Sequence, residues 1–584
     1  MLPSTPNSTG QPDKPTANAT SQSTIQNGAE QEYPSPEIGN GSQKSTQEPA
    51  GEKPTNHVNL PEAGRTKFQT TVIMGALSMS LFLSALDSTI ITTAVPTIVS
   101  HFDAPVGYIW VGSAYLLGNA AVVPVWGKIS DIFGRKQTLL GAVSVFLLGS
   151  LLCAISQSMG MLIAARAIQG IGGGGAIVLP NLCISDLFSM KERGMYFGLL
   201  SAVWALASAL GPVVGGIFTD RVSWRWCFYI NLPLGGLALA VLVFFLKLHN
   251  PRTPIKQGLA AIDWIGNLLI VGGTLMVLMG LQFGGVEFAW KSATVICLIV
   301  FGAVSVALFC IYESRFATYP VIPPRIFRHR NSVAAYSLSI MHAMAFLGGT
   351  YWLPLYFQAV LGASSLLSGV YLLPYVISSS FLSVGSGMFI KKTGNFRWPI
   401  VVGLFVMTLG FGLLTYLDDE PHWDRIIIFQ IIAGLGSGTN FQAPLIALQT
   451  NIEPRDIGAA VSAYSFARQI GTSVSVVLGG VVFSNVMNSQ QGLLKSALGP
   501  QLASEFSGRN ASASIEKIAG LPLGQEQTVR ATYWDALQKM FILYACVSFF
   551  GLLLSLFIRQ TKLSQEHTEH KTGLQSLKKE DARK

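Results

Sequence analysis

Two charged residues, Asp87 and Arg166, stand inside long apolar stretches of this 584-residue chain. An ionised carboxylate at the centre of a bilayer is disfavoured by about 2.5–3.5 kcal/mol on insertion scales, so a carboxylate kept there points to a function. The chemistry open to Asp87 is the binding and release of a proton. The sequence therefore predicts that Asp87 and Arg166 are the residues that couple transport to protons.

A polar stripe accompanies Asp87 along its apolar stretch. Its members recur at helical spacing, which predicts that one face of the helix borders a wet cavity rather than lipid; they are Ser80, Ser84, Asp87, Ser88 and Thr92. Two alternatives stay open: Asp87 as a cap or hydrogen-bond partner in helix packing, and Arg166 snorkelling to the outer headgroups. Arg468 and His342 are weaker candidates within apolar stretches, and a lone histidine there is more often a hydrogen-bond partner between helices.

A second concentration of charge is the stretch "GKISDIFGRK" at 127–136, which places Lys128, Asp131, Arg135 and Lys136 within ten residues, although only 12% of the chain is charged. Gly127 and Gly134 permit a tight turn and a close approach of helices. Asp131 can pair with Arg135, with Lys136 or with the end of a neighbouring helix.

The stretch "GIGGGG" contains G-x-G-x-x-G, but a dinucleotide site is excluded because no strand precedes it and no acidic residue follows about twenty positions later. Gly170 and Gly174, beside Gln169, instead predict a seam of small residues where two helices touch. Gly211 and Gly215 predict another such seam, and Gly434 and Gly438 a third.

Composition and motifs exclude several other classes of protein. Basic residues are spread over short loops and two tails, so we expect no nucleic-acid partner. The apolar stretches hold no paired carboxylates, no histidine pair and no H-E-x-x-H, so we expect no enzyme, no metal and no cofactor. A Walker loop is also missing, which argues against ATP as the energy source.

Half of the residues are hydrophobic and they gather in runs of about twenty, which indicates an all-α polytopic membrane protein. We predict fourteen transmembrane helices, near 71–95, 107–126, 138–156, 161–182, 195–218, 227–247, 263–283, 293–312, 332–353, 369–390, 399–417, 426–448, 459–483 and 539–558.

The distribution of lysine and arginine orients these spans. With both ends in the cytoplasm, the short inner loops hold about sixteen basic residues and the short outer loops about four. The stretch 484–538 is then predicted to be an extracellular loop, and Asn510 in it is a predicted glycosylation site. Counted from the outer ends of their helices, Asp87 and Arg166 lie at a similar depth of about 8–12 Å.

The two halves of the chain repeat each other weakly. "GIGGGGAIVLP" at 170–180 matches "GLGSGTNFQAP" at 434–444 in three glycines and a proline, and "GMFIKKTG" at 387–394 keeps the glycine spacing of "GKISDIFG". Such repeats indicate two packed half-bundles. We predict a cytoplasmic tail at 1–66 that is disordered, a six-helix bundle at 67–248, two inserted helices at 249–315, a second six-helix bundle at 316–560 and a cytoplasmic tail at 561–584.

The stretch at 127–136 resembles the signature loop of the major facilitator superfamily. Further stretches resemble motifs of its fourteen-span drug:proton antiporters in their fungal form: "LDSTIITTAVP" at 86–96, "RAIQGIGGGG" at 166–175, and "ALGPVVGG" at 209–216 together with Gly198. In the last of these, the antiporter motif, Ala207 stands where the family usually has glycine. The resemblance covers about residues 68 to 560.

The resemblance implies the major facilitator fold, with two six-helix half-bundles plus two inserted helices, and proton-coupled efflux of drugs, toxins or fungal secondary metabolites. It assigns the loop at 127–136 to a cytoplasmic latch between the half-bundles, and it gives the antiporter motif, Gly198, Gly211, Pro212, Gly215 and Gly216, a role in limiting leak through a bend at Pro212. In the second half Lys391 replaces Asp131, so a latch of unlike charges between the matching loops is a further hypothesis.

Alternative functions remain open. The chain could carry basic amino acids or iron chelates across the plasma or vacuolar membrane, although such substrates call for more cavity carboxylates than Asp87 alone. It could also be a non-transporting sensor on the same fold. We expect a monomeric, multi-pass protein of the plasma membrane, with the vacuolar membrane as the alternative, whose partners are a small-molecule substrate, protons and the lipid bilayer.

Overall fold

The computed structural model describes residues 66–563, apart from short gaps at 105–106, 247, 249–250, 252, 286–287, 509–510 and 512–513, together with Gly573. The disordered tail predicted at 1–66 lies outside these residues except for Thr66, as do Asn510 and most of the tail predicted at 561–584. Thr66 begins the first helix: its side chain accepts a hydrogen bond from the backbone of Gln69, and the Gln69 side chain accepts one from the backbone of Thr66.

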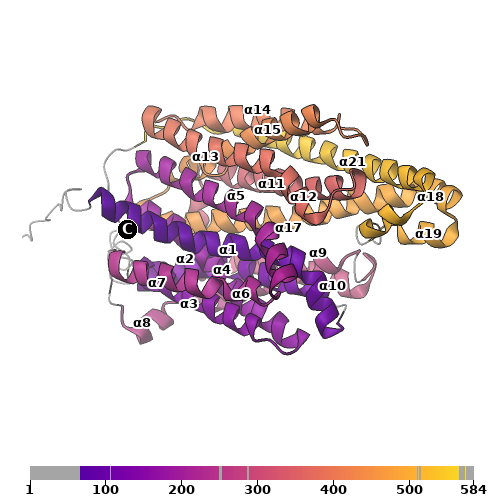
Figure 1. The fold of residues 1–584 in the computed structure, drawn as a ribbon. Coiled ribbons are helices and arrows are strands. Elements are labelled where there is room, and N and C mark those ends of the chain that lie inside the picture. Colours follow the sequence, from indigo (N-terminus) through magenta and orange to yellow (C-terminus); the bar gives the residue numbers. More distant parts are fainter. Residues whose placement is uncertain are drawn as a thin grey trace, which may run out of the picture. The chain divides into compact units, whose positions relative to one another are not determined.

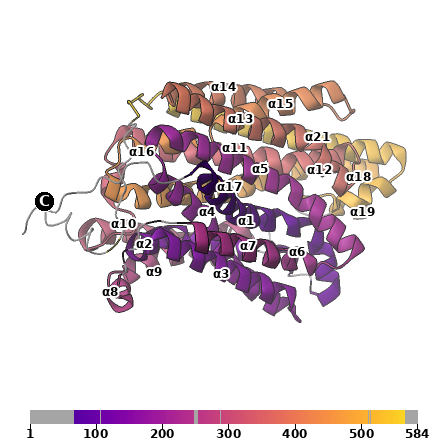
Figure 2. The same ribbon diagram turned by 60° about the vertical axis from the view of Figure 1, so that its left-hand side comes forward.

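Helices at the start of the chain pack mainly on one another, with α1 against α5 and α7, and α4 between α2 and α3 (Figures 1 and 2). Their bounds are α1 Lys67–Phe102, α2 Gly107–Phe133, α3 Arg135–Ala154, α4 Met159–Leu187, α5 Met190–Arg221, α6 Trp226–Tyr229 and α7 Asn231–Phe245. Three helices follow, α8 Ile255–Ala260, α9 Trp264–Phe283 and α10 Ala293–Arg315. Of these, α9 and α10 pair with each other, and α9 also contacts α2.

The remaining helices form the second group, in which α15 packs on α13 and α14, and α11 on α17 and α21. Their bounds are η1 Pro324–Phe327, α11 Arg330–Leu355, η2 Tyr356–Val360, α12 Ser365–Tyr371, α13 Leu373–Thr393, α14 Arg397–Leu414, α15 Trp423–Thr439, α16 Ala443–Gln449, η3 Pro454–Asp456, α17 Ile457–Ser489, α18 Gln491–Leu498, α19 Pro500–Glu505, η4 Ile515–Gly520 and α21 Leu523–Ser555. The two groups meet where α2 packs on α17 and α5 on α13.

The all-α prediction is confirmed: the described residues contain no strand, only one isolated bridge between Gly284 and Phe288. Within the part of the chain that the structure describes, thirteen helical segments are long and apolar enough to cross a membrane. Each of the fourteen predicted spans overlaps a helix, and the one outside these thirteen is α2, whose 27 residues reach about 40 Å.

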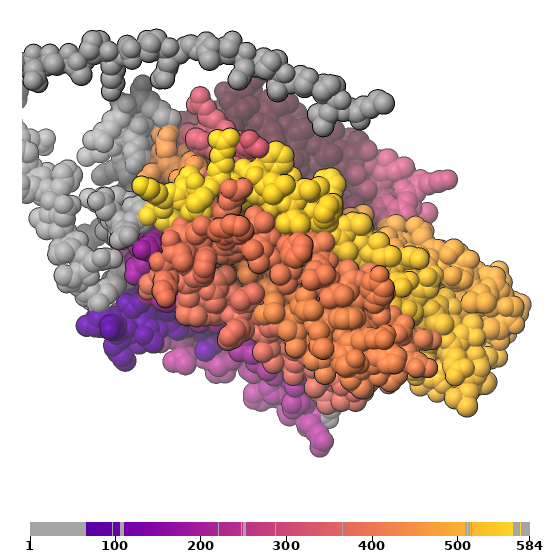
Figure 3. All heavy atoms as spheres, turned by 90° about the horizontal axis from the view of Figure 1, so that it is seen from above, coloured from indigo at the N-terminus to yellow at the C-terminus, as the bar shows by residue number. Residues whose placement is uncertain are grey.

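The surface seen in Figure 3, orange to yellow over α14, α15 and α21, carries many large apolar side chains that are exposed. Examples are Trp398, Phe405, Ile428, Phe549 and Phe550. A water-soluble protein rarely exposes so much contiguous apolar surface, whereas lipid covers it without cost. These helices therefore present a lipid-facing surface.

Glycines let helices of each group approach closely, and the repeat in the sequence is visible in these contacts. A Cβ at Gly170 would lie 2.2 Å from the Tyr115 carbonyl oxygen, and one at Gly434 would lie 2.4 Å from that of Tyr375. A Cβ at Gly174 would be 2.8 Å from the Asn119 oxygen of α2. The small residues predicted as a seam thus sit where α4 touches α2 and where α15 touches α13.

The stretch 484–538, predicted as a loop, is largely helical. It holds the end of α17, then α18, α19 and η4, and the first turns of α21, which begins sixteen residues before the predicted span. Leu494, Phe506 and Tyr533 are buried among these segments. Their side chains join the main apolar core of the second group of helices, which explains why the region does not extend as a loop.

Candidate functional site

Asp87 of α1 and Arg166 of α4 form an ion pair through Oδ2 and Nη1, and both residues are 0% exposed. Arg166 Nε donates to the Val111 carbonyl oxygen at 2.9 Å, and the guanidinium carbon lies 4.5 Å from the centre of the Tyr115 ring. The ring face offers the guanidinium a cation–π contact where Nη2 has no hydrogen-bond partner among the described residues.

Two amides hold the other oxygen of Asp87. Gln169 Nε2 donates to Asp87 Oδ1 at 2.7 Å, and Asn231 Nδ2 of α7 donates to the same oxygen at 3.1 Å. Both amides also bond the hydroxyl of Ser150 in α3, at 2.7 and 3.2 Å. The carboxylate is therefore surrounded by donors from two helices, α4 and α7.

Tyr115 extends this network into α2. Its hydroxyl lies 2.7 Å from Ser84 Oγ and donates to the Ser84 carbonyl oxygen at 2.9 Å. Ser84 Oγ in turn donates to the Gly173 carbonyl oxygen of α4 at 3.2 Å. Side chains of α1, α2, α3, α4 and α7 thus meet in one buried polar cluster, here called the proton site after the role predicted for Asp87 and Arg166: Ser84, Asp87, Tyr115, Ser150, Arg166, Gln169 and Asn231.

The polar stripe of α1 differs from the prediction. Ser80, Ser84 and Asp87 are buried among neighbouring helices rather than facing a wet cavity, and only Thr92 is exposed. Arg166 does not snorkel to the surface, because its guanidinium is enclosed by Asp87, Tyr115 and Phe228. In this conformation the proton site is closed to bulk water.

Residues 127–136, here called the gate loop, are mostly helical: α2 continues to Phe133 and α3 begins at Arg135. Gly134 makes the turn with φ of 96°, in the left-handed region that favours glycine. Arg135 Nη1 lies 2.6 Å from Asp131, and its Nε lies 2.8 Å from Asp186 of α4. One buried arginine therefore joins the ends of α2, α3 and α4.

The gate loop packs on the first turns of α17, in the other group of helices. A Cβ at Gly127 would lie 1.8 Å from Ser462 Oγ, and one at Gly458 would lie 2.3 Å from Asp131 Oδ1. Asp131 thus faces the N-terminal end of α17, where a carboxylate interacts favourably with the helix dipole. Gly127 serves this close approach rather than a turn.

Asp131 and Lys391 do not form the predicted latch of unlike charges. Lys391 lies 3.8 Å from Glu192 of α5, and Lys136 donates to the Val243 carbonyl oxygen at 2.7 Å. The reason is the symmetry of the repeat, in which α2 packs on α17 while its counterpart α13 packs on α5. Each loop therefore contacts a helix of the opposite group instead of the matching loop.

The antiporter motif lies on α5, which runs without interruption through Pro212. Cβ atoms at Gly211 and Gly215 would lie 2.0 and 2.1 Å from Thr89 Oγ1 and the Ile90 oxygen of α1, so these two glycines line the seam with α1. Gly198 touches α13 instead, with its Cβ position 2.6 Å from the Ser383 oxygen, whereas a Cβ at Gly216 would meet none of the described residues within 4 Å.

Sequence reasoning missed several polar residues that the fold brings to these sites. Ser150, Asn231 and Tyr115 in the proton site and Asp186 beside Arg135 had no assigned role. The available signal was a single polar residue in an apolar span, as in "YINLPLGG" at 229–236. Helix pairing is needed before such a residue can be assigned to a partner.

Comparison with known proteins supports the fold. The family model described as Major Facilitator Superfamily matches residues 77–476. The chain is 49% identical over 516 residues to the efflux pump dotC of Dothistroma septosporum, covering 88% of this chain and 89% of that protein. It is 34% identical over 526 residues to the efflux pump FUS6 of Gibberella moniliformis, covering 89% and 93%.

Among solved structures, the chain resembles the proton:xylose symporter XylE with a TM-score of 0.56 at 16% identity, over 85% of this chain and 98% of that one. At this identity the likeness concerns the fold alone. Helix pairing, family model and full-length relatives agree, and this chain belongs to the major facilitator superfamily of multi-pass membrane transporters.

Proposed function

We propose that this chain is a secondary active exporter that couples the outward movement of small organic molecules to the inward movement of protons. The observation that carries the proposal is the Asp87–Arg166 ion pair, buried inside the first group of helices and held by amides from Gln169 and Asn231. Removing two charges from water costs free energy, so a transporter that retains a buried ion pair has a use for it. That use is the change of the carboxyl group between its ionised and protonated states.

In this proposal Asp87 is the proton carrier. When a proton neutralises Asp87, Arg166 loses its counter-charge, and the enclosed conformation loses its main electrostatic support. Breaking a buried pair in this way costs about 3–5 kcal/mol. That energy favours a second arrangement in which the helices around the proton site separate and admit water.

The gate loop couples that change to the two groups of helices. Asp131 and Arg135 hold α2, α3 and α4 together against the first turns of α17. Separation of the groups at this end breaks the contacts at Gly127 and Gly458. We assign this end to the cytoplasm on the excess of basic residues in its loops, so the structure corresponds to the state closed on the cytoplasmic side.

The proton gradient is an adequate energy source. One charge crossing 100 mV gains about 2.3 kcal/mol, which sustains about a fiftyfold concentration gradient of substrate. A pH difference adds to this.

The names of the relatives support the class of substrate that we propose. Both dotC and FUS6 are named efflux pumps, which supports export of a drug-like or toxic small molecule, including a mycotoxin, by this chain. We propose that it acts as a monomer in the plasma membrane, which is the membrane that a compound leaving the cell has to cross.

Accumulation of candidate compounds in cells with and without this chain tests the proposal. Cells with the chain should hold less compound, and an uncoupler that collapses the proton gradient should abolish the difference. A difference that survives the uncoupler would refute proton coupling, and equal accumulation of a broad panel of compounds would refute export.

A further inference from the structure

The twelfth span is broken, unlike its counterpart in the first half. Helix α15 ends at Thr439 and α16 begins at Ala443, whereas α4 runs unbroken through Pro180. Pro444 offers no N–H to continue the ladder, and the Asn440 side chain donates instead to the Gly436 oxygen at 3.3 Å and Thr439 Oγ1 at 3.0 Å. Interrupted membrane helices expose backbone groups and mark binding sites in transporters.

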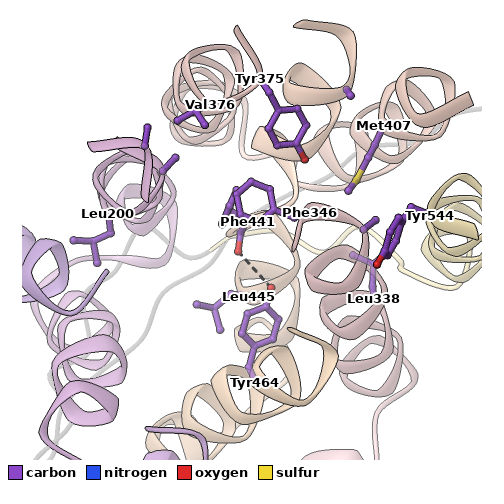
Figure 4. Close-up of a cluster of buried hydrophobic side chains, with 14 of the residues drawn as sticks. Leu200, Leu338, Phe346, Tyr375, Val376, Met407, Phe441, Leu445, Tyr464 and Tyr544 are labelled. Carbon is purple, nitrogen blue, oxygen red and sulfur yellow. Dashed lines mark hydrogen bonds between the residues drawn. The ribbon is translucent and has the colours of Figure 1, made fainter. Parts of the chain in front are cut away.

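Arg468 of α17 lies against this break. Its Nη1 donates to the Phe441 carbonyl oxygen at 3.2 Å, and its guanidinium carbon lies 5.0 Å from the centre of the Phe441 ring. Tyr464, one turn earlier, reaches the same carbonyl at 3.5 Å, as the dashed line in Figure 4 shows. The broken helix thus fixes one side of the guanidinium and leaves Arg468 partly exposed.

Arg468 differs from Arg166 in its counter-charge. Arg166 pairs with Asp87, whereas no carboxylate of the described residues lies within 4.0 Å of the Arg468 guanidinium. Eleven residues separate Arg468 from the start of α17, so it lies about 16 Å into the helix, far from either end. A cation kept inside a span without an acidic partner is suited to an anion that arrives from outside the protein.

The surroundings favour an organic anion over an inorganic one. The Phe441 ring lies 4.7 Å from that of Phe346 and 5.1 Å from that of His342. Figure 4 shows Phe441 and Phe346 side by side, with Tyr464 and Leu445 next to them. Among the described residues, Asn440 Oδ1, Gln442 Oε1 and His342 Nδ1 are buried near the break without hydrogen-bond partners. The site therefore combines one cation with aromatic surface and spare polar atoms.

We infer that Arg468 binds the anionic group of the transported substrate, a carboxylate or an ionised phenol on an amphiphilic organic molecule. The inference rests on the proposed function for the transport itself, and adds the substrate class and the residue that recognises it. Proton coupling and substrate recognition then involve separate arginines: Arg166, the partner of Asp87, in the first group of helices and Arg468 in the second.

Binding of a matched pair of probes to the purified full-length protein tests the inference without any transport. The probes are 1-pyrenecarboxylate and the uncharged, similarly shaped 1-pyrenecarboxamide, titrated by pyrene fluorescence at neutral pH. The native protein should bind the carboxylate about tenfold to a hundredfold more tightly, as expected for one charge-assisted hydrogen bond. The Arg468→Gln variant should lose this discrimination and retain binding of the carboxamide, whereas Arg468→Lys should keep part of it.

The matched control is Arg425→Gln, which removes an arginine from the end of α15 where it pairs with Asp418 at 3.1 Å. It should leave both affinities unchanged. Equal affinities for the two probes in the native protein, or discrimination that survives Arg468→Gln, would overturn the inference. If discrimination depends on Arg468 but cells with and without the chain accumulate 1-pyrenecarboxylate equally, the inference stands and the proposed export fails.

Discussion

At the scale of single residues, the proton site depends on how completely its polar atoms are paired. Gln169 donates to Asp87 and to Ser150 and accepts from Arg166 at 2.7 Å, so one side chain connects both charges to α3. A buried group left without its partner costs about 1–3 kcal/mol. Gln169 is therefore expected to contribute more to stability than an ordinary buried glutamine.

The Gln169→Ala variant should lower the thermal stability of the purified protein and reduce proton-coupled transport, because Asp87, Arg166 and Ser150 lose the side chain that bonds all three. The control is Gln430→Ala on α15, a buried glutamine whose amide bonds only the Ile426 oxygen of its own helix. It should cost less stability and leave proton-coupled transport unchanged. Equal effects of the two variants would mean that Gln169 contributes no more than an ordinary buried glutamine.

Residue types alone predicted Asp87 and Arg166, because a charge in an apolar span stands out. They could not predict Ser150 or Asn231, because one hydroxyl or amide in an apolar span has many partners available and the choice depends on which helices touch. The predicted wet face of α1 was wrong for a similar reason: a polar stripe looks the same whether water or Tyr115 and Gly173 satisfies it.

At the scale of helices, small residues decide which pairs approach closely, and α5 shows this most clearly. Gly211 and Gly215 contact α1 closely, whereas a Cβ at Gly216 in the same motif would meet none of the described residues within 4 Å. The sequence predicted the seam from glycine spacing. It did not distinguish Gly216 from its neighbours, since that distinction requires the rotation of α5 about its axis.

The Gly211→Val variant should destabilise the protein by about 1–3 kcal/mol, as overpacking does, and reduce transport, because its side chain collides with Thr89. Gly216→Val is the matched control and should be close to neutral in both. Thermal unfolding and substrate-coupled proton flux in vesicles measure the two effects. Equal effects of Gly211→Val and Gly216→Val would mean that the antiporter motif does not act through close contact with α1.

At the scale of the whole molecule, two groups of helices meet through α2 on α17 and α5 on α13. The repeat in the sequence predicted two halves, and the resemblance to the superfamily placed the charged gate loop between them. The matching loops were expected to contact each other. Instead, the loop of each half contacts a helix of the other half, and Asp131 lies against Gly458 of α17. Which helices pair between the halves depends on how the halves are arranged in space, and a repeat in the sequence does not specify that arrangement.

The Gly458→Ala variant should change the rate of the transport cycle more than the affinity for substrate, because its methyl group pushes Asp131 away at a distance from Arg468 and Asp87. Gly480→Ala in the same helix adds a methyl group where nothing lies within 4 Å and should have little effect. Turnover in vesicles and affinity of the purified protein separate the two quantities. A large loss of affinity with unchanged turnover would contradict the role of the gate.

The central claim is that Asp87 carries the proton, and its most direct measurement is proton flux driven by substrate in vesicles that contain the native protein or Asp87→Asn. The amide preserves the size of the side chain and can still accept a hydrogen bond from Gln169 or Asn231, but it cannot exchange a proton. The variant should insert and fold, bind substrate, and show no substrate-driven proton movement and no uphill transport. Proton-coupled transport at the native rate by Asp87→Asn would contradict the account.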